Sequence, residues 1–476
     1  MKFVKYVIIA FTLLIGACNK NPNSYNDEQV ELAQTPPLGW NSFDSYGVYL
    51  HEEAALANVE AFAEKLKPHG YEFYVIDAGW FGEFELQPGT IYPAEKHAKK
   101  MNMNKYGLLQ PSETYFPNGL KPIIDRCHEL GFKFGLHLMR GIPREAVHQN
   151  LPVMGTNYTA ADIADTTSIC SWNHQNYGVD MSKPGAQEFY NSLINQMAEW
   201  GVDFIKYDDL VPFPEEIKGI SNAIENCGSP IVFSLSPGNN ADPSQIEAFK
   251  TAHTLRVTPD IWDEQKGIDE CFDAWRKWQG KEEPGFWIDM DMIPFGQLQL
   301  MSPKPKGVEG TESKAEITKK LKSGELSNVE LLAGKGWTRH CEFTKDQMHT
   351  FITLRALAAS PLMMGGDLPT LDDFSLSLIT HKEVLECNQN GIMGSLKYDA
   401  DGIEVWNTPK KDSNHGWLGI FNRTEGIKSI SLENVDLGLD NNIQYVLRDV
   451  WNEKTVTTLD FDINPNGVVF LVYTQK

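Results

Sequence analysis

The sequence predicts an α/β fold, a (β/α)8 TIM barrel followed by a C-terminal antiparallel β-sandwich domain. Three observations support this prediction. Eight short apolar segments alternate with amphipathic ones, most of the apolar segments end in an acidic residue, and the pattern changes to short strands and turns after about residue 388. Alternating strands and helices build a parallel sheet, and eight such units can close into a barrel.

The N-terminus resembles a lipoprotein signal peptide. Lys2 and Lys5 precede an apolar run over residues 6–17 that is too short to span a bilayer comfortably. The run ends in IGAC, similar to a bacterial lipobox in which Cys18 is lipidated; the alternative is an ordinary cleaved signal with a chance cysteine. We expect an exported protein anchored by lipid, in the periplasm or at the outer membrane or cell surface.

The predicted boundaries follow from these patterns. They are 1–17 for the signal peptide, 18–34 for a polar tether, 35–387 for the barrel with a loop insertion near 296–335, and 388–476 for the C-terminal β domain. The insertion contains a Lys-rich stretch without the barrel pattern, and such loops often border a substrate pocket. The last region carries alternating strand and turn signals.

Each predicted barrel strand is a short apolar run. The candidate strands are 38–44, 71–79, 132–139, 202–209, 230–237, 254–260, 285–291 and 361–367. The segments between them include EEAALANVEAFAEKLKPHG and TKDQMHTFITLRALAAS, in which apolar residues recur at helical spacing.

Six of these strands lead into an aspartate. The six residues are Asp44, Asp77, Asp208, Asp260, Asp291 and Asp367. The carboxyl ends of the strands form the active-site rim of such a barrel, and several carboxylates there would repel one another unless a substrate or a cationic group used them. One or two of the six are expected to cap the following helix instead.

Composition excludes several classes of protein. The chain has 476 residues, 41% of them hydrophobic, which is enough for a large buried core and more than one domain. A net charge of −22 leaves no basic surface for nucleic acid or an anionic membrane, so no nucleic-acid partner is expected. Six cysteines remain after Cys18 without a C-x-x-C pair, which disfavours a zinc ribbon or a dense disulfide framework.

The motif IKYDDL contains the first candidate catalytic group. Lys206 and Asp208 are two apart on a strand and point to the same face, whereas Asp209 points to the other. An adjacent ammonium favours the ionised form of Asp208, as a carboxylate nucleophile requires. The alternative is a buried structural pair of Lys and Asp.

The motif RVTPD contains the second candidate. Arg256 and Asp260 share one face of an extended strand, and Pro259, Ile261 and Trp262 give Asp260 a partly apolar setting that would favour its protonated form. A general acid at neutral pH requires such a setting. One ionised and one protonated carboxyl group suit glycoside hydrolysis.

These motifs resemble glycoside hydrolase family 27, the α-galactosidase family, from residue 35 to near the C-terminus. The matching segments are PPLGWNSFDSYG, YVIDAGW, AEWGVDFIKYDDL, RVTPD, FWIDMDM, TKDQMHTFITLRALAASPLMMGGDL and VLECNQN. The resemblance implies a retaining mechanism without a cofactor, with Asp208 as nucleophile and Asp260 as acid/base. It further implies a glycone pocket lined by Trp40, Asp77, Lys206, Arg256 and Asp291.

Three departures from the family pattern concern the sugar. Family α-galactosidases usually show two adjacent acids after strand two, where this chain has Asp77 and Ala78, so one hydroxyl contact is expected to be lost. His137 replaces the usual tyrosine of strand three, and Ser236 stands at a pocket position of strand five. We therefore include His137 and Ser236 among the expected substrate-binding residues.

Other departures concern the surrounding loops. Arg140 and Arg144 are additions that would bind an anionic or extended substrate or, as we favour, form ordinary ion pairs. Cys170 resembles a family cysteine whose usual partner position is occupied here by Leu210, so that bridge is expected to be absent.

The sequence thus predicts an exo-acting retaining α-glycosidase, an α-galactosidase acting on oligo- or polysaccharides. One alternative keeps the mechanism but changes the glycone to an α-glucoside, with release of isomaltose, or to a β-L-arabinopyranoside. A second is a metal-dependent hydrolase using His137 and His174; no metal-ligand spacing is present, and Lys206 and Arg256 would compete with a cation. A third is a non-catalytic carbohydrate-binding lipoprotein.

Overall fold

The computed structural model describes residues 32–94, 98–302, 323 and 338–476. The predicted signal peptide, the proposed lipidation site Cys18, most of the tether and most of the predicted insertion lie outside the described residues. Within the described part of the chain, no helix is both long and apolar enough to cross a membrane.

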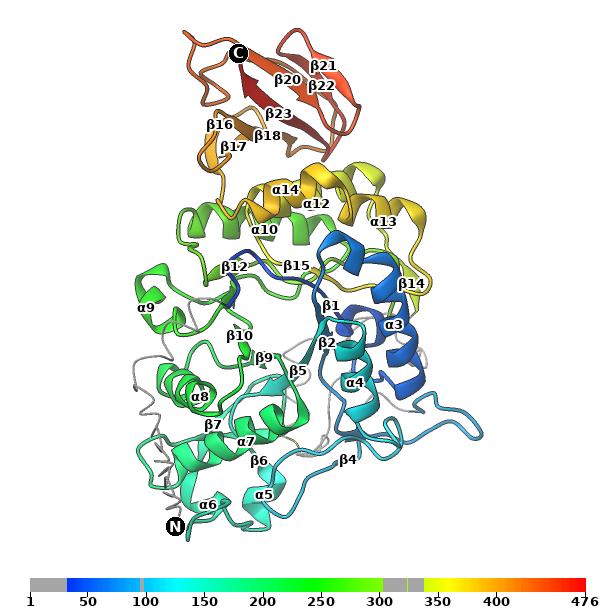
Figure 1. Cartoon of the computed structure of the whole chain (residues 1–476), viewed down its shortest axis with the longest axis vertical. Coiled ribbons are helices and arrows are strands. Elements are labelled where there is room, and N and C mark those ends of the chain that lie inside the picture. Colours follow the sequence, from blue (N-terminus) through cyan, green and yellow to red (C-terminus); the bar gives the residue numbers. More distant parts are fainter. Residues whose placement is uncertain (1–31, 95–97, 303–322, 324–337) are drawn as a thin grey trace, which may run out of the picture.

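Eight parallel strands form the centre of the larger domain (Figure 1). They are β1 (Leu38–Asn41), β2 (Phe73–Ile76), β5 (Lys133–Met139), β9 (Phe204–Asp208), β10 (Val232–Leu235), β11 (Thr254–Arg256), β12 (Trp287–Asp289) and β15 (Leu362–Met364). Neighbouring strands follow the sequence order, and β15 pairs with β1. A parallel bridge between Ile293 and Met364 joins the segment after β12 to β15. The predicted barrel is confirmed, with one strand in each predicted segment.

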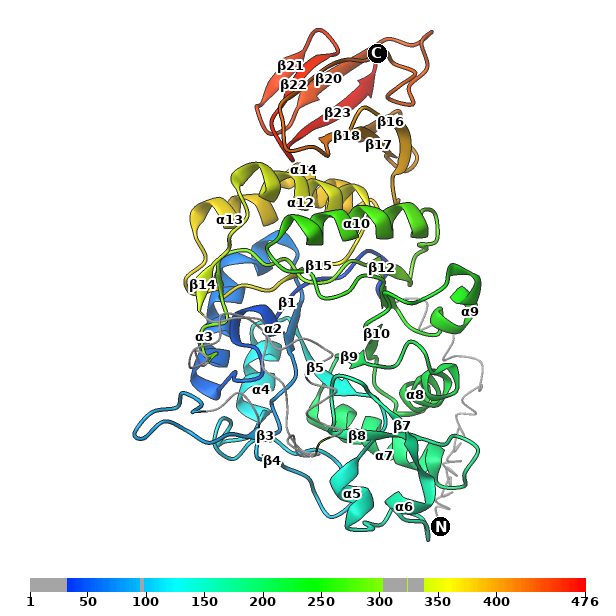
Figure 2. The same ribbon diagram turned by 180° about the vertical axis from the view of Figure 1, so that it is seen from behind.

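Helices cover the outside of the strands (Figures 1 and 2). They are α3 (Glu52–Lys65), α4 (Lys121–Glu129), α7 (Ala186–Trp200), α8 (Pro214–Asn226), α9 (Ile246–Phe249), α10 (Gln265–Trp278), α12 (Lys345–Leu357), α13 (Asp373–Ile379) and α14 (Lys382–Gln389). Local sequence sets their limits. Thr344, for example, begins α12 with a capping box to Gln347, which satisfies backbone N–H groups that the first helical turn leaves free.

Smaller elements decorate the loops. After β1 comes α2 (Phe43–Tyr46), and after β2 the hairpin of β3 (Gly82–Glu83) and β4 (Lys100–Met101). The long β5–α7 connection contains β6 (Ile142–Pro143), α5 (Arg144–His148), α6 (Ala160–Ile163), β7 (Ala164–Ile169) and β8 (Asn176–Val179). The strands β13 (Gln297–Leu298) and β14 (Arg339–His340) pair beside the undescribed insertion. The 3-10 turns are η1 (Lys67–His69) and η2 (Pro243–Gln245).

The C-terminal domain is antiparallel, as predicted. Its larger sheet has the order β16 (Ser395–Ala400), β17 (Ile403–Pro409), β18 (His415–Asn422), β23 (Val468–Gln475), β20 (Tyr445–Asp449) and β21 (Lys454–Val456). The strands β19 (Lys428–Ser431) and β22 (Asp460–Ile463) form a second, two-stranded sheet. Apolar side chains from both sheets form a separate core that includes Val405, Ile420 and Ile463.

The C-terminal domain packs against α10, α12 and α14 of the barrel (Figure 1). Trp275 of α10 stacks on Trp406 of β17, with ring centroids 3.7 Å apart. Arg423 donates to Asp269 of α10 at 2.7 Å and also pairs with Glu404. A stacked aromatic pair surrounded by ion pairs therefore joins the two domains.

Candidate active site

A cavity of about 820 Å³ lies at the carboxyl ends of the barrel strands. Its wall brings together the titratable side chains Asp44, Asp77, His137, Lys206, Asp208, Asp209, Arg256, Asp260 and Asp291. Five of the six aspartates expected at the rim are among them. The sixth, Asp367, accepts hydrogen bonds from Tyr46 Oη and Thr370 Oγ1, both at 2.6 Å, and is not part of the wall that the described residues form.

Asp208 is the last residue of β9, and only one of its carboxylate oxygens has a hydrogen-bond partner among the described residues. His137 Nε2 lies 2.9 Å from Oδ2, while Oδ1 is buried and has no hydrogen-bond partner among the described residues. Burial opposes ionisation, but the hydrogen bond from His137 and the positive charges of Lys206 and Arg256 outweigh it and hold the pKa of Asp208 far below its usual value. The geometry leaves an ionised oxygen available for chemistry.

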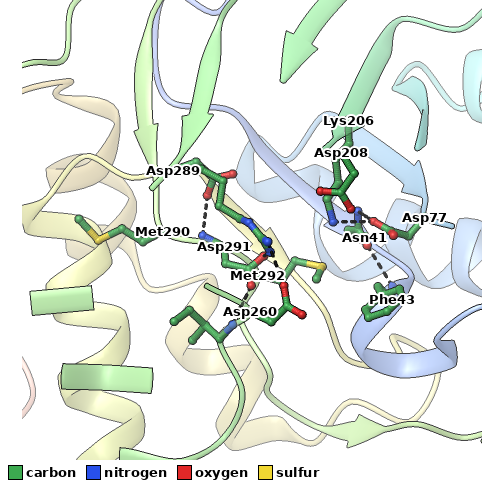
Figure 3. A network of polar contacts seen from close by, with 12 residues as sticks. Asn41, Phe43, Asp77, Lys206, Asp208, Asp260, Asp289, Met290, Asp291 and Met292 are labelled. Atoms are coloured by element: carbon green, nitrogen blue, oxygen red, sulfur yellow. Dashed lines mark hydrogen bonds and ion pairs between the residues drawn. The ribbon is translucent and has the colours of Figure 1, made fainter. Parts of the chain in front are cut away.

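Lys206 and Asp77 form a second charged group beside Asp208 (Figure 3). Lys206 Nζ donates to Asp77 Oδ2 at 2.8 Å, and Asn41 Nδ2 donates to the same oxygen at 2.7 Å. Burial works against the charge on Asp77, yet Lys206 lowers its pKa; the same pairing raises the pKa of Lys206 against burial. Both groups are therefore held in their charged forms.

Arg256 organises the opposite side of the cavity. Its guanidinium lies 2.9 Å from Asp260 Oδ1 and 2.9 Å from Asp291 Oδ1. Asp291 also accepts from the backbone N–H of Ile261 at 2.8 Å, which connects the β12 end to the Asp260 loop. Figure 3 shows this group and the Asp77–Lys206–Asp208 group as two separate sets.

The expected apolar setting of Asp260 is wrong. Its side chain is 65% exposed, because it extends from the loop into the open cavity while Ile261 and Trp262 are buried beside it. The ion pair with Arg256 orients the carboxyl group.

The structure also corrects two expected pocket residues. Trp40 is buried, stacks on Tyr74 and donates from its indole N–H to Gly366 O at 2.7 Å, so it belongs to the core. Phe43, just beyond the end of β1, lines the cavity in its place. Ser236 is buried and does not line the cavity. Pro237, the second residue after β10, lines it instead.

Sequence reasoning missed several lining residues that lie outside the strand ends. Ser171, Trp172 and Asn173 enter the wall from the β7–β8 connection, and Trp262 enters from the loop after β11. The hairpin that carries the first three was not predicted, because its short strands carry no regular apolar alternation.

Arg140 forms the ion pairs that the sequence favoured, whereas Arg144 contacts a backbone carbonyl. Arg140 is buried between Asp209 at 3.1 Å and Glu216 at 2.7 Å. Arg144 donates to Asn176 O at 3.1 Å. Neither arginine lines the cavity among the described residues.

Neither a metal-binding cluster nor a disulfide is present in the described part of the chain. There, no group of three or more His, Cys, Asp and Glu side chains could hold a metal ion. The cysteines at 127, 170, 227, 271, 341 and 387 all have free thiols, Cys170 among them.

Comparisons with known proteins match this architecture. The Melibiase family model matches residues 33–223, and the model for an alpha galactosidase C-terminal beta sandwich domain matches residues 400–473. The GH27 β-L-arabinopyranosidase of Geobacillus stearothermophilus is 36% identical with a TM-score of 0.80, and the match covers 94% of this chain and 98% of that one. The chain belongs to glycoside hydrolase family 27.

More distant relatives support this membership over most of the chain. Alpha-galactosidase of Cyamopsis tetragonoloba is 24% identical over 91% of this chain and 84% of its own length. Alpha-galactosidase A of Cellvibrio japonicus is 24% identical over 93% of this chain and 92% of its own length. The protein is therefore a glycoside hydrolase of family 27, and its rim cavity lies where a barrel enzyme has its active site.

Proposed function

We propose that this family 27 hydrolase releases a terminal α-linked galactose from an oligo- or polysaccharide by a retaining, exo-acting mechanism. The observation that carries the proposal is the contrast between two carboxyl groups in one cavity. Asp208 is held ionised, and one of its oxygens has no partner among the described residues. Asp260 is exposed and forms an ion pair with Arg256 on the opposite side of the cavity. Such a pair supplies the nucleophile and the acid/base of a double displacement.

In the first step, Asp208 Oδ1 attacks the anomeric carbon and Asp260 gives its proton to the glycosidic oxygen as the bond to the leaving group breaks. In the second step, Asp260 takes a proton from water, which attacks the same carbon and displaces Asp208. The sugar leaves with its original anomeric configuration, and both carboxyl groups return to their starting states.

The surrounding side chains would bind the sugar and stabilise charge. His137 and Lys206 favour the anionic form of Asp208, so they also make it a good leaving group in the second step. Arg256 fixes Asp260 and Asp291 with two contacts of 2.9 Å. Charged groups that are already held by partners in the cavity wall need little rearrangement when substrate binds.

A β-L-arabinopyranoside is the second candidate substrate. This sugar has the ring configuration of α-D-galactopyranose but lacks the hydroxymethyl group. Ala78 lines the cavity next to Asp77, where an acid is usual in family α-galactosidases, and the Geobacillus stearothermophilus relative is named for this activity. A lost hydroxyl contact would weaken selection for the larger sugar.

The test is release of 4-nitrophenol from a panel of aryl glycosides. The panel contains the α-galactoside, α-glucoside, α-N-acetylgalactosaminide and β-L-arabinopyranoside, with Asp208→Asn as the inactive control. Turnover of the α-galactoside with retained configuration, followed by NMR of the released sugar, supports the proposal. Preference for the arabinopyranoside favours the second candidate, and turnover that Asp208→Asn does not reduce contradicts both.

We further propose that the enzyme is exported and attached to a membrane by lipid on Cys18, at the periplasmic or cell-surface side. The IGAC sequence after an apolar run is the support for this proposal. A polar tether over residues 18–34 would leave the catalytic domain free to reach a polysaccharide.

A further inference from the structure

Asp44 is a buried acid of the cavity wall to which the mechanism above gives no role. It lies in α2, directly after β1, with 1% of its surface exposed. Its backbone carbonyl accepts from the backbone N–H and the side chain of Gln299, which fixes the position of the residue. Its side-chain Oδ2 has no hydrogen-bond partner among the described residues.

An unpartnered buried carboxyl group is costly, because desolvation is not repaid by a hydrogen bond. Burial and the nearby Asp291 raise the pKa of Asp44 well above its usual value, while Lys206 acts in the opposite direction; Asp263 and Asp260 also raise it. Most buried polar groups in proteins have partners, so an exception in a cavity wall points to a partner supplied by a ligand.

The fold makes specific room for this carboxyl group. A side chain at Gly365, the residue after β15, would clash with both Oδ2 and Cγ of Asp44. The φ angle of Gly365 does not require glycine, since it is not among the positive values. Glycine at position 365 therefore leaves room for the carboxyl group of Asp44.

Asp44 also lies at the corner where the usual acid is missing. Ser42 Oγ accepts from the backbone N–H of Asp77 at 2.9 Å, which joins the end of β1 to the end of β2. Ala78 follows Asp77 and lines the same cavity as Asp44. The ends of β1 and β2 thus present the carboxyl groups of Asp44 and Asp77, and none from position 78.

We propose that Asp44 binds a hydroxyl group on the edge of the terminal sugar that faces β1 and β2, and that it helps to select the sugar. The inference rests on the proposed glycosidase function. A carboxyl group can accept from a hydroxyl when ionised or donate to one when protonated, so either form provides a contact. Asp44 acts here as a specificity residue, while bond cleavage remains with Asp208 and Asp260.

The experiment compares wild type with Asp44→Asn and Asp44→Ala on the preferred aryl glycoside and on analogues lacking one hydroxyl at a time. We expect kcat/KM on the full sugar to fall about 10–100-fold in Asp44→Ala, the size of a lost hydrogen bond to a buried group. On the analogue that lacks the contacted hydroxyl, the same substitution should change kcat/KM less than about threefold. Equal losses on every analogue, or no loss on any, would overturn the proposal.

Two further variants separate binding from folding. Gly365→Ala leaves Asp44 in the chain but displaces its carboxyl group, so it should reproduce the analogue-dependent loss. Asp373→Asn changes an exposed acid of α13 and serves as the matched control, with no effect expected. The unfolding temperature of Asp44→Asn should equal or exceed that of wild type, because the variant removes a buried unpaired acid. A large decrease in this temperature with unchanged sugar discrimination would assign Asp44 a structural role.

Calorimetry in an Asp208→Asn background makes the test independent of turnover. Free galactose and free L-arabinose are the probes, and Asp44→Ala should weaken the better-bound sugar about 10-fold or more. If Asp208→Asn proves fully active, the catalytic assignment fails while the binding result still stands. If the sugar binds equally well with and without Asp44, the present inference fails while the catalytic assignment is unaffected.

Discussion

Asp208 and Asp260 are the same type of residue but lie in different surroundings. The Asp208 side chain is 14% exposed and contacts His137, whereas the Asp260 side chain is 65% exposed and contacts Arg256. Positive charge near a buried carboxylate stabilises its anion, while an exposed carboxyl group can exchange protons with substrate and water. This difference supports the proposed division into nucleophile and acid/base.

Replacing the nucleophile should separate binding from turnover. Asp208→Asn keeps the shape of the side chain and removes the charged oxygen, so we expect kcat to fall by more than about a thousandfold. Binding of the free sugar, measured by calorimetry, should remain within about threefold of wild type because the other wall residues are unchanged. Activity close to that of wild type would contradict the nucleophile assignment.

His137 should control the acid limb of the pH profile. The pKa of Asp208 is lowered in the folded protein, so its anion persists at every pH above that value and is lost only as the pH falls through it. His137→Phe removes the hydrogen bond to Asp208, so burial is opposed only by Lys206 and Arg256 and the pKa of Asp208 should rise. We expect the acid limb of kcat/KM to move up by about one pH unit or more.

A matched variant tests whether this shift is local. His128 forms a similar pair with Asp203, 2.8 Å away, but on the outside of the barrel with 40% of its side chain exposed. His128→Phe should leave the acid limb in place. An unchanged limb in His137→Phe would show that Asp208 does not set the acid side of the profile.

At the scale of elements, Arg140 holds the loop that follows the nucleophile strand. It bridges Asp209, whose φ of 59° lies in the left-handed region, and Glu216 of α8. Glu216 also accepts from Tyr190 of α7 and from the backbone of Val179. One buried arginine thus ties β5, β9, α7 and α8 together.

Removing Arg140 should destabilise the barrel. Arg140→Met leaves buried Glu216 and half-buried Asp209 without their shared cation, and breaking a buried pair in this way costs about 3–5 kcal/mol of unfolding free energy. Urea unfolding measures the loss. Arg126→Met is the control, because its pairs with Glu60 and Glu129 lie on the surface; a similar loss in both variants would contradict a special role for Arg140.

At the scale of the molecule, the C-terminal domain depends on its contact with the barrel. Trp406→Ala removes a fully buried side chain from the stack with Trp275 and should lower the unfolding free energy by about 3–5 kcal/mol. We expect KM to stay near the wild-type value, since neither tryptophan lines the cavity that the described residues form. Ile427→Ala, at a position 68% exposed, should show no loss of stability in the same calorimetric scan.

The proposed lipid anchor predicts how the enzyme distributes between the membrane and soluble fractions. Cys18→Ser should prevent acylation and move the enzyme from the membrane fraction to the soluble fraction, with kcat/KM unchanged on a small aryl glycoside. Labelling with a fatty-acid analogue checks the modification directly. Label on the Cys18→Ser variant would contradict the assigned site.

The sequence by itself determined the architecture and the location of the candidate site. Apolar runs of strand length alternate with helical spacing, and both signals are local, so the eight strands could be placed before the structure was known. The shared edge of parallel strands then put Asp208 and Asp260 at one rim. The same local reasoning placed Lys206 and Asp208 in one cavity, since their spacing fixes the face of the strand.

Only the tertiary structure decided which neighbours these side chains meet. Trp40 and Phe43 are close in sequence, but the closing of the barrel buries one and exposes the other to the cavity. Asp260 is exposed because its loop extends beyond the strand, and the carboxyl group of Asp44 is buried against Gly365 from a distant segment. Burial and pairing depend on segments far apart in the chain, and local sequence patterns carry no record of those contacts.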